Sequence, residues 1–178
     1  MKCGANNFHL ILHLIAHPSY NRNDAKRSVA INGFNLKLLD LLSDNGEILP
    51  AWYGVYTYRA VVKAAALFGD GQIEEGYEAL EKAIQYSEKI ESLKEGDLLE
   101  IGDPYLFGGA KLVWGKWQIQ LPDGSVEPIN YDWFMGYCGR NLFYAMTAPH
   151  GWEWFDPVRN EDRFKEYVER ARKMADKT

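Results

Sequence analysis

Residues 72–92 read QIEEGYEALEKAIQYSEKIES, and this stretch carries the clearest structural signal in the chain. Apolar residues recur every three or four positions, so they gather on one helical face while charged residues occupy the other. Glu78 and Lys82 also stand in the favourable i,i+4 order. The pattern predicts an amphipathic α-helix. Its apolar face comprises Ile73, Tyr77, Leu80, Ile84 and Ile90.

Three more helices are predicted before this one, over residues 6–17, 24–45 and 52–68. Pro18 stops the first, and Asn23 or Asp24 can cap the second. Gly46 suits the left-handed position that closes the second helix. The turn Gly69-Asp70-Gly71 separates the third helix from the fourth. Consecutive helices joined by short turns pack antiparallel, so we expect helical hairpins over residues 1–94.

The pattern changes to strands and turns over residues 95–130. Leu98–Ile101 is compatible with a short strand, and Lys111–Leu121 alternates like a strand. Pro122-Asp123-Gly124 is a turn sequence, and Ser125–Ile129 returns as the second strand of a hairpin. In the longer strand, Trp117 is expected on the buried side. Helical signals then resume over residues 131–148 and 160–175. The sequence therefore predicts one mostly α domain, residues 1–178, with a β-hairpin near residues 111–129 and C-terminal helices over 131–178.

Composition and charge narrow the functional classes. The chain has 178 residues and a net charge of −5. Residues 69–110 hold eleven acids against three lysines, which disfavours contact with a phosphate backbone. Two cysteines are too few for a disulfide scaffold, and the apolar run Phe8–Ala16 is too short to span a bilayer. We expect a cytoplasmic protein with no membrane contact and no cofactor.

Two segments resemble parts of a known family. Gly71–Ile84 resembles the second helix of a tetratricopeptide repeat, including the small residue Ala79 where paired helices approach. Trp154–Phe164 is similar to the closing segment of tetratricopeptide-like regions in bacterial regulators. We expect Trp154, Phe155 and Phe164 to pack on the preceding helices. The resemblance implies a tetratricopeptide-like helical array that binds proteins and carries no catalytic residues.

The leading hypothesis is a non-enzymatic protein-interaction module that binds a protein or peptide partner in regulation. Aromatic residues make up 14% of the chain, and large aromatics line grooves and interfaces as well as cores. The candidate partner- or ligand-binding residues are Trp52, Tyr56 and Trp114. A small-molecule or metal-binding sensor and an enzyme without a recognisable motif stay open as alternatives.

A histidine stripe is the candidate metal site. His9, His13 and His17 are spaced i, i+4, i+8, which places them on one side of a helix. Two histidines at i,i+4 can share a metal ion. All the other residues from Phe8 to Ala16 are apolar, so we favour the histidines as the polar face of an amphipathic helix, with a metal site as the alternative.

A DNA-binding regulator is a further alternative. Arg22, Lys26 and Arg27 form a small basic cluster before Gly33, which is a candidate turn of a helix-turn-helix. The recognition helix would then be Asn35–Leu42, which is mostly apolar and offers little to read base edges. We therefore expect no specific nucleic-acid binding by this chain alone.

Overall fold

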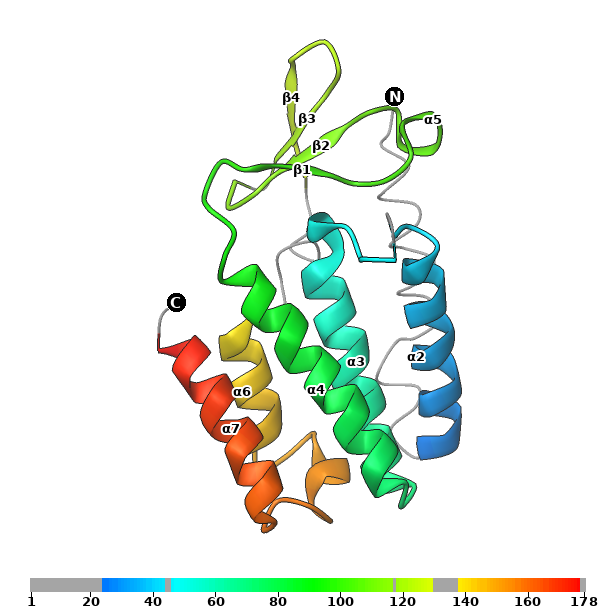
Figure 1. The fold of residues 1–178 in the computed structure, drawn as a ribbon, viewed down its shortest axis with the longest axis vertical. Coiled ribbons are helices and arrows are strands. Elements are labelled where there is room, and N and C mark those ends of the chain that lie inside the picture. Colours follow the sequence, from blue (N-terminus) through cyan, green and yellow to red (C-terminus); the bar gives the residue numbers. More distant parts are fainter. Residues whose placement is uncertain (1–23, 44–45, 117, 130–137, 177–178) are drawn as a thin grey trace.

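The computed structural model describes residues 24–43, 46–116, 118–129 and 138–176 (Figure 1). Helices α2, α3 and α4 lie side by side, and α6 and α7 lie beside α4 on the side away from α2. A small sheet stands at one end of the helices (Figure 1). The helices are α2 (Ala25–Asp40), α3 (Tyr53–Gly69), α4 (Ile73–Ile90), α5 (Pro104–Phe107), α6 (Gly139–Thr147) and α7 (Asp162–Ala175), with 3-10 turns η2 (Pro50–Trp52) and η3 (Glu153–Phe155). The prediction of a mostly helical fold is confirmed.

The helix ends follow local chemistry. Asp24 caps α2, because its Oδ1 accepts a hydrogen bond of 2.9 Å from the backbone N–H of Arg27. α2 ends at Asp40, five residues before the predicted end. Leu42 N–H donates to the Leu39 carbonyl, and the Ser43 hydroxyl donates to the Asp40 carbonyl at 2.6 Å. These tight hydrogen bonds satisfy the last carbonyls and stop the helix. The predicted helix over residues 6–17 lies outside the described residues.

Helix α3 is the centre of the core. Fourteen of its 17 residues are buried, so it is packed on several sides by other parts of the protein. Alanines at positions 60, 64, 65 and 66 let neighbouring helices approach closely. At the α3–α4 corner, a Cβ on Gly76 would lie 2.5 Å from the Phe68 ring, so only glycine fits there.

The C-terminal segment packs on this core as predicted. Phe155 and Phe164 are buried, and their ring centroids lie 5.9 and 6.4 Å from that of Phe68. Trp154 lies against Gly69, where a Cβ would come within 2.6 Å of the indole. The end of α3, η3 and the start of α7 therefore share one aromatic cluster.

The strand prediction is confirmed in part: the predicted short strand near Leu98–Ile101 and the predicted hairpin turn are present, but they belong to a four-stranded antiparallel sheet. The strands are β1 (Leu98–Glu100), β2 (Lys111–Val113), β3 (Gln118–Gln120) and β4 (Val126–Pro128), in the order β1-β2-β3-β4. The predicted long strand Lys111–Leu121 is two strands, because the chain reverses around Gly115, which has φ +76°. The predicted turn at Pro122–Gly124 is confirmed between β3 and β4. Trp117 lies outside the described residues.

One row of side chains seats the sheet on the helices. Leu99 pairs with Leu112, Leu112 pairs with Ile119, and all three are buried. The Trp52 indole N–H donates to the Ile101 carbonyl at 2.6 Å and ties the start of α3 to the sheet. By contrast, β4 is exposed along its whole length. None of the helices in the described part of the chain is long and apolar enough to cross a membrane.

Candidate functional site

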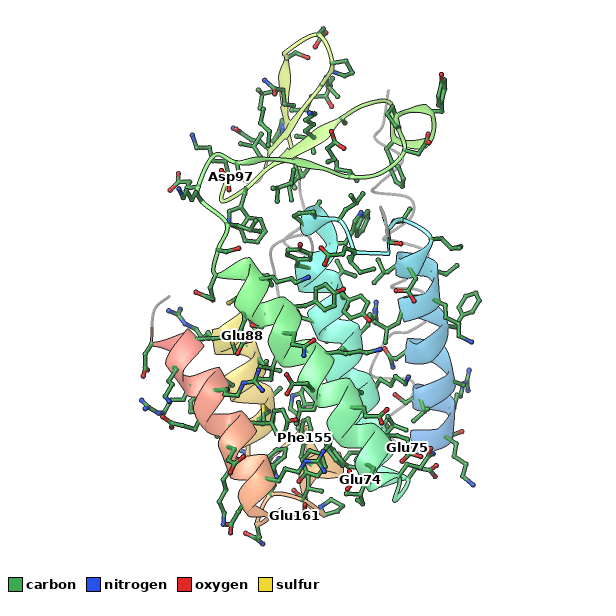
Figure 2. The ribbon with its side chains drawn as sticks, viewed as in Figure 1. Glu74, Glu75, Glu88, Asp97, Phe155 and Glu161 are labelled. Carbon is green, nitrogen blue, oxygen red and sulfur yellow. The ribbon has the colours of Figure 1, made fainter. Side chains whose placement is uncertain are left out.

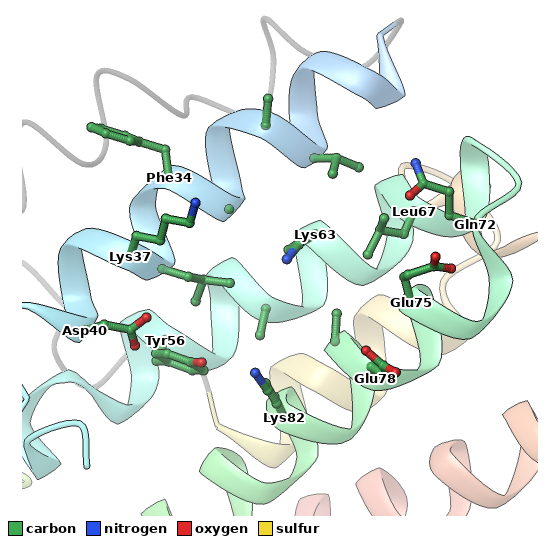
Figure 3. A pocket seen from close by; sticks show the side chains of 16 residues that line it. Phe34, Lys37, Asp40, Tyr56, Lys63, Leu67, Gln72, Glu75, Glu78 and Lys82 are labelled. Carbon is green, nitrogen blue, oxygen red and sulfur yellow. The ribbon is translucent and has the colours of Figure 1, made fainter. Parts of the chain in front are cut away.

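An open groove of about 610 Å³ lies between α2, α3 and α4 (Figure 3). Each helix contributes one face to it, since the lining residues recur every three or four positions along α2, α3 and α4. Its lining residues include Gly33, Phe34, Lys37, Asp40, Tyr56, Ala60, Lys63, Leu67, Glu75, Glu78, Ala79 and Lys82.

The groove exists because small residues line it. Gly33 in α2, Ala60 in α3 and Ala79 in α4 leave space that larger side chains would fill. Among the described residues, the nearest atom to a Cβ built on Gly33 is Cε of Lys63, at 4.0 Å. A glycine inside a helix costs about 0.5–1 kcal/mol relative to alanine. Gly33 therefore weakens α2 slightly and keeps this part of the groove free of a side chain.

Three lysines line the middle of the groove, with Lys63 between Lys37 and Lys82 (Figure 3). Lys63 is half-buried on α3, and the exposed Lys37 and Lys82 come from α2 and α4. Burial lowers the pKa of Lys63, and the charges of Lys82 and Lys37 lower it further, while Glu78 raises it. The lysines are thus close enough for their charges to interact.

Acidic side chains lie toward the two ends. Asp40 lies beside Tyr56 at one end, and Glu75 and Glu78 lie on α4 toward the other end (Figure 3). Burial, with the negative charge of Asp40, raises the pKa of Tyr56 to about 12, so its hydroxyl stays neutral at physiological pH. Tyr56 is a hydrogen-bonding group at the edge of an otherwise apolar floor.

The charged side chains of the groove have no ion-pair partners among the described residues. Within the part of the chain that the structure describes, none of the six charged lining residues forms an ion pair or a side-chain hydrogen bond. They are Lys37, Asp40, Lys63, Glu75, Glu78 and Lys82. Such groups are available for charged groups of a ligand.

The sequence-predicted binding residues have different places. Tyr56 lines the groove and packs against Tyr86 in a tilted arrangement, with 4.2 Å between the ring centroids. Trp52 is completely buried under the sheet. Trp114 is half-buried, packs against the core and does not line the groove. The structure thus brings one of the three aromatic candidates to the groove.

The histidine and basic-cluster candidates are placed only in part. His9, His13, His17 and Arg22 lie outside the described residues. Over the described ranges, no three His, Cys, Asp or Glu residues come together in a way that could hold a metal ion. Lys26 and Arg27 are exposed at the start of α2.

Sequence reasoning missed the three lysines. Each belongs to a different helix, and each helix alone shows an ordinary solvated lysine. The available signal was the small residue one turn from each lysine on the same helical face: Gly33 before Lys37, Ala60 before Lys63 and Ala79 before Lys82. Comparison with protein-family models, curated proteins and solved structures finds no match.

Proposed function

We propose that this chain is a non-enzymatic protein-interaction module that binds a peptide segment of a regulatory partner in the groove between α2, α3 and α4. The observation that carries the proposal is the groove itself, with an apolar floor and six charged side chains that have no ion-pair partner among the described residues. Apolar contact supplies affinity, and charges of both signs select the partner.

The shape of the groove favours a peptide over a small molecule. Pockets for small ligands enclose most of the ligand surface, whereas this groove is only partly enclosed. α2 has 16 residues, which corresponds to about 24 Å of helix at about 1.5 Å per residue. An extended peptide of about seven residues, at about 3.3 Å each, has the same length.

The chemistry of the lining residues favours binding over catalysis. The described lining residues include no cysteine, serine or histidine, and none of its carboxylates is hydrogen-bonded to a nucleophile. An open groove also does not exclude water, as closed active sites do. The antiparallel α2, α3 and α4 layer supports the proposal of a tetratricopeptide-like array, in which a groove between helices takes an extended or helical peptide.

The test is a selection of randomised peptides of about seven residues, displayed on phage, against the immobilised full chain. Gly33→Phe places a ring in the groove, and Gly33→Ala is the matched control that adds one methyl at an ordinary contact distance, 4.0 Å, from Cε of Lys63. We expect selected peptides to bind the wild type and Gly33→Ala alike, and Gly33→Phe at least about tenfold more weakly. Circular dichroism confirms that each variant is folded. The absence of any peptide that distinguishes the wild type from a folded Gly33→Phe would refute the proposal.

A further inference from the structure

The middle of the groove has a chemical character that narrows its ligand. Three lysines from three different helices line this part of the groove beside small residues (Figure 3). They are Lys37, Lys63 and Lys82. Bringing three positive charges together is unfavourable, most of all for the half-buried Lys63, and the negative charge of Glu78 offsets this only in part, because the pKa of Lys63 stays lowered. A bound anion removes this cost and can accept a hydrogen bond from each ammonium.

Elsewhere around α4, basic side chains have partners. Lys89 pairs with Glu47 at 3.7 Å, Arg163 with Glu74 at 2.8 Å, and Arg170 with Glu81 at 2.7 Å. The three groove lysines lack such partners among the described residues although Glu75 and Glu78 are on the same face. The ammonium groups are therefore positioned for a group that comes from outside.

We infer, on the basis of the proposed peptide-binding function, that the groove selects peptides with a carboxylate at their centre, held by Lys37, Lys63 and Lys82. The acidic residues at the two ends of the groove favour a ligand with a single carboxylate over a polyanion. Asp40 lies at one end, and Glu75 and Glu78 lie toward the other. A polyanion such as a nucleic acid would meet repulsion at both ends, whereas a single carboxylate can lie among the three lysines, although the charge of Glu78 also reaches Lys63.

The residues next to the carboxylate are also constrained. Phe34 is half-exposed at the groove, and Leu67 and Ala60 form apolar wall and floor near Lys63. An apolar side chain beside the carboxylate buries itself there. A basic side chain on the other side of the carboxylate pairs with Glu75 or Glu78. The expected ligand is a short peptide in which an acidic residue stands between an apolar and a basic one.

The experiment repeats the phage selection with Lys63→Gln and Lys82→Gln chains and sequences the selected peptides. We expect enrichment of Asp or Glu at one central position with the wild type and loss of that enrichment with Lys63→Gln. A synthetic peptide from the wild-type selection should bind Lys63→Gln at least about tenfold more weakly, since a charge-assisted hydrogen bond is lost. Lys82 is exposed, so Lys82→Gln should leave the fold intact. Weaker peptide binding by this variant would then report the loss of the ammonium group. Binding of a peptide with central Lys by Lys63→Glu would confirm the charge pairing.

Two further arms identify the carboxylate. If the lysines bind a side-chain carboxylate, replacing the central Asp or Glu of the peptide by Asn or Gln should abolish binding. If they bind the C-terminal carboxylate of the peptide, C-terminal amidation should abolish it. A duplex oligonucleotide serves as the polyanion probe and should not compete. Two results would overturn this inference and leave the proposed function intact. In both, the selected peptides bind Gly33→Phe more weakly than the wild type; in one they show no preference for an acidic residue, and in the other they bind Lys63→Gln as well as the wild type. If no peptide discriminates against Gly33→Phe, the proposed function fails and the inference fails with it.

Discussion

Helix α4 has charged residues on two sides, and those that face α7 form ion pairs whereas those that face the groove do not (Figure 2). On the side of α7, glutamates seven residues apart each meet an arginine: Glu74 meets Arg163, and Glu81 and Glu88 meet Arg170. On the groove side, Glu75, Glu78 and Lys82 have no ion-pair partner among the described residues. The α4–α7 contact thus contains ion pairs that the groove side lacks among the described residues.

Aromatic packing separates the two regions further. Tyr77 donates its hydroxyl hydrogen to Glu161 at 2.6 Å, and the Arg163 guanidinium lies 3.9 Å from the Tyr77 ring centroid. Phe155 and Phe164 fill the space behind. In the groove, Phe34 is half-exposed instead. Substitutions on the α7 side should therefore reduce stability, whereas those in the groove should reduce binding.

The largest effect is expected for Phe155→Ala on the α7 side. Phe155 is completely buried among Phe68, Trp152 and Phe164, so truncation leaves a cavity. The free energy of unfolding, measured by urea denaturation, should fall by about 3–5 kcal/mol. Leu41→Ala, at a residue that is 79% exposed, is the control and should change it by less than about 0.5 kcal/mol. Equal losses in both variants would contradict the aromatic cluster as the centre of this region.

Two helical glycines give the next largest contrast. A Cβ on Gly139 would clash with Cβ of Met174, where α6 and α7 touch, whereas one on Gly33 would lie 4.0 Å from Cε of Lys63, an ordinary contact. Gly139→Ala should reduce the free energy of unfolding by about 1–3 kcal/mol, because α7 must shift. Gly33→Ala should raise it by up to about 1 kcal/mol, because alanine favours the helix. Urea denaturation of both variants tests this, and the same sign for the two would break the comparison.

The ion pairs of Arg170 should contribute less. Arg170→Met should cost about 1 kcal/mol or less at neutral pH, because the pairs are partly exposed. Hydrogen bonding to Arg170 holds the pKa of Glu81 below 4.5. This stabilisation is therefore complete above about pH 4.5 and disappears as the pH falls through the folded-state pKa. Unfolding of the wild type and the variant between neutral and acidic pH should converge. A constant difference would show that Arg170 acts by packing alone.

The smallest effect is expected in the groove. Burial and two neighbouring lysines lower the pKa of Lys63, so its charged form destabilises the folded state at neutral pH. Lys63→Met should raise the free energy of unfolding by less than about 1 kcal/mol, because the side chain is half exposed. The gain should shrink as the pH rises through the folded-state pKa toward 10.5. Lys116→Met, at an exposed lysine, is the control. Lower stability of Lys63→Met would show that Lys63 already has a stabilising partner.

Local signals predicted much of the fold. The periodicity of residues 72–92 gives α4, and the turn glycines fix where α3 ends. The strands were harder, because each of β1 to β4 has three residues, too few for an alternation to be distinguished from a loop. Gly115 reads as one residue of a long strand until its positive φ is known.

The candidate site was less accessible to prediction. Aromatic content pointed to Trp52, which the fold uses to fasten the sheet. The groove depends on how α2, α3 and α4 align, and helix periodicity alone does not give the register between helices. Lys37, Lys63 and Lys82 therefore become one cluster only after folding.

The last strand of the sheet has a consequence for the behaviour of the protein at high concentration. An exposed edge strand is a template on which another chain can add a strand. In β4, Pro128 has no N–H to donate, and Glu127 places a negative charge in the middle of a strand of three residues. Two copies that meet at this edge gain few backbone hydrogen bonds and repel each other. The β4 edge is therefore a poor template for pairing with another strand.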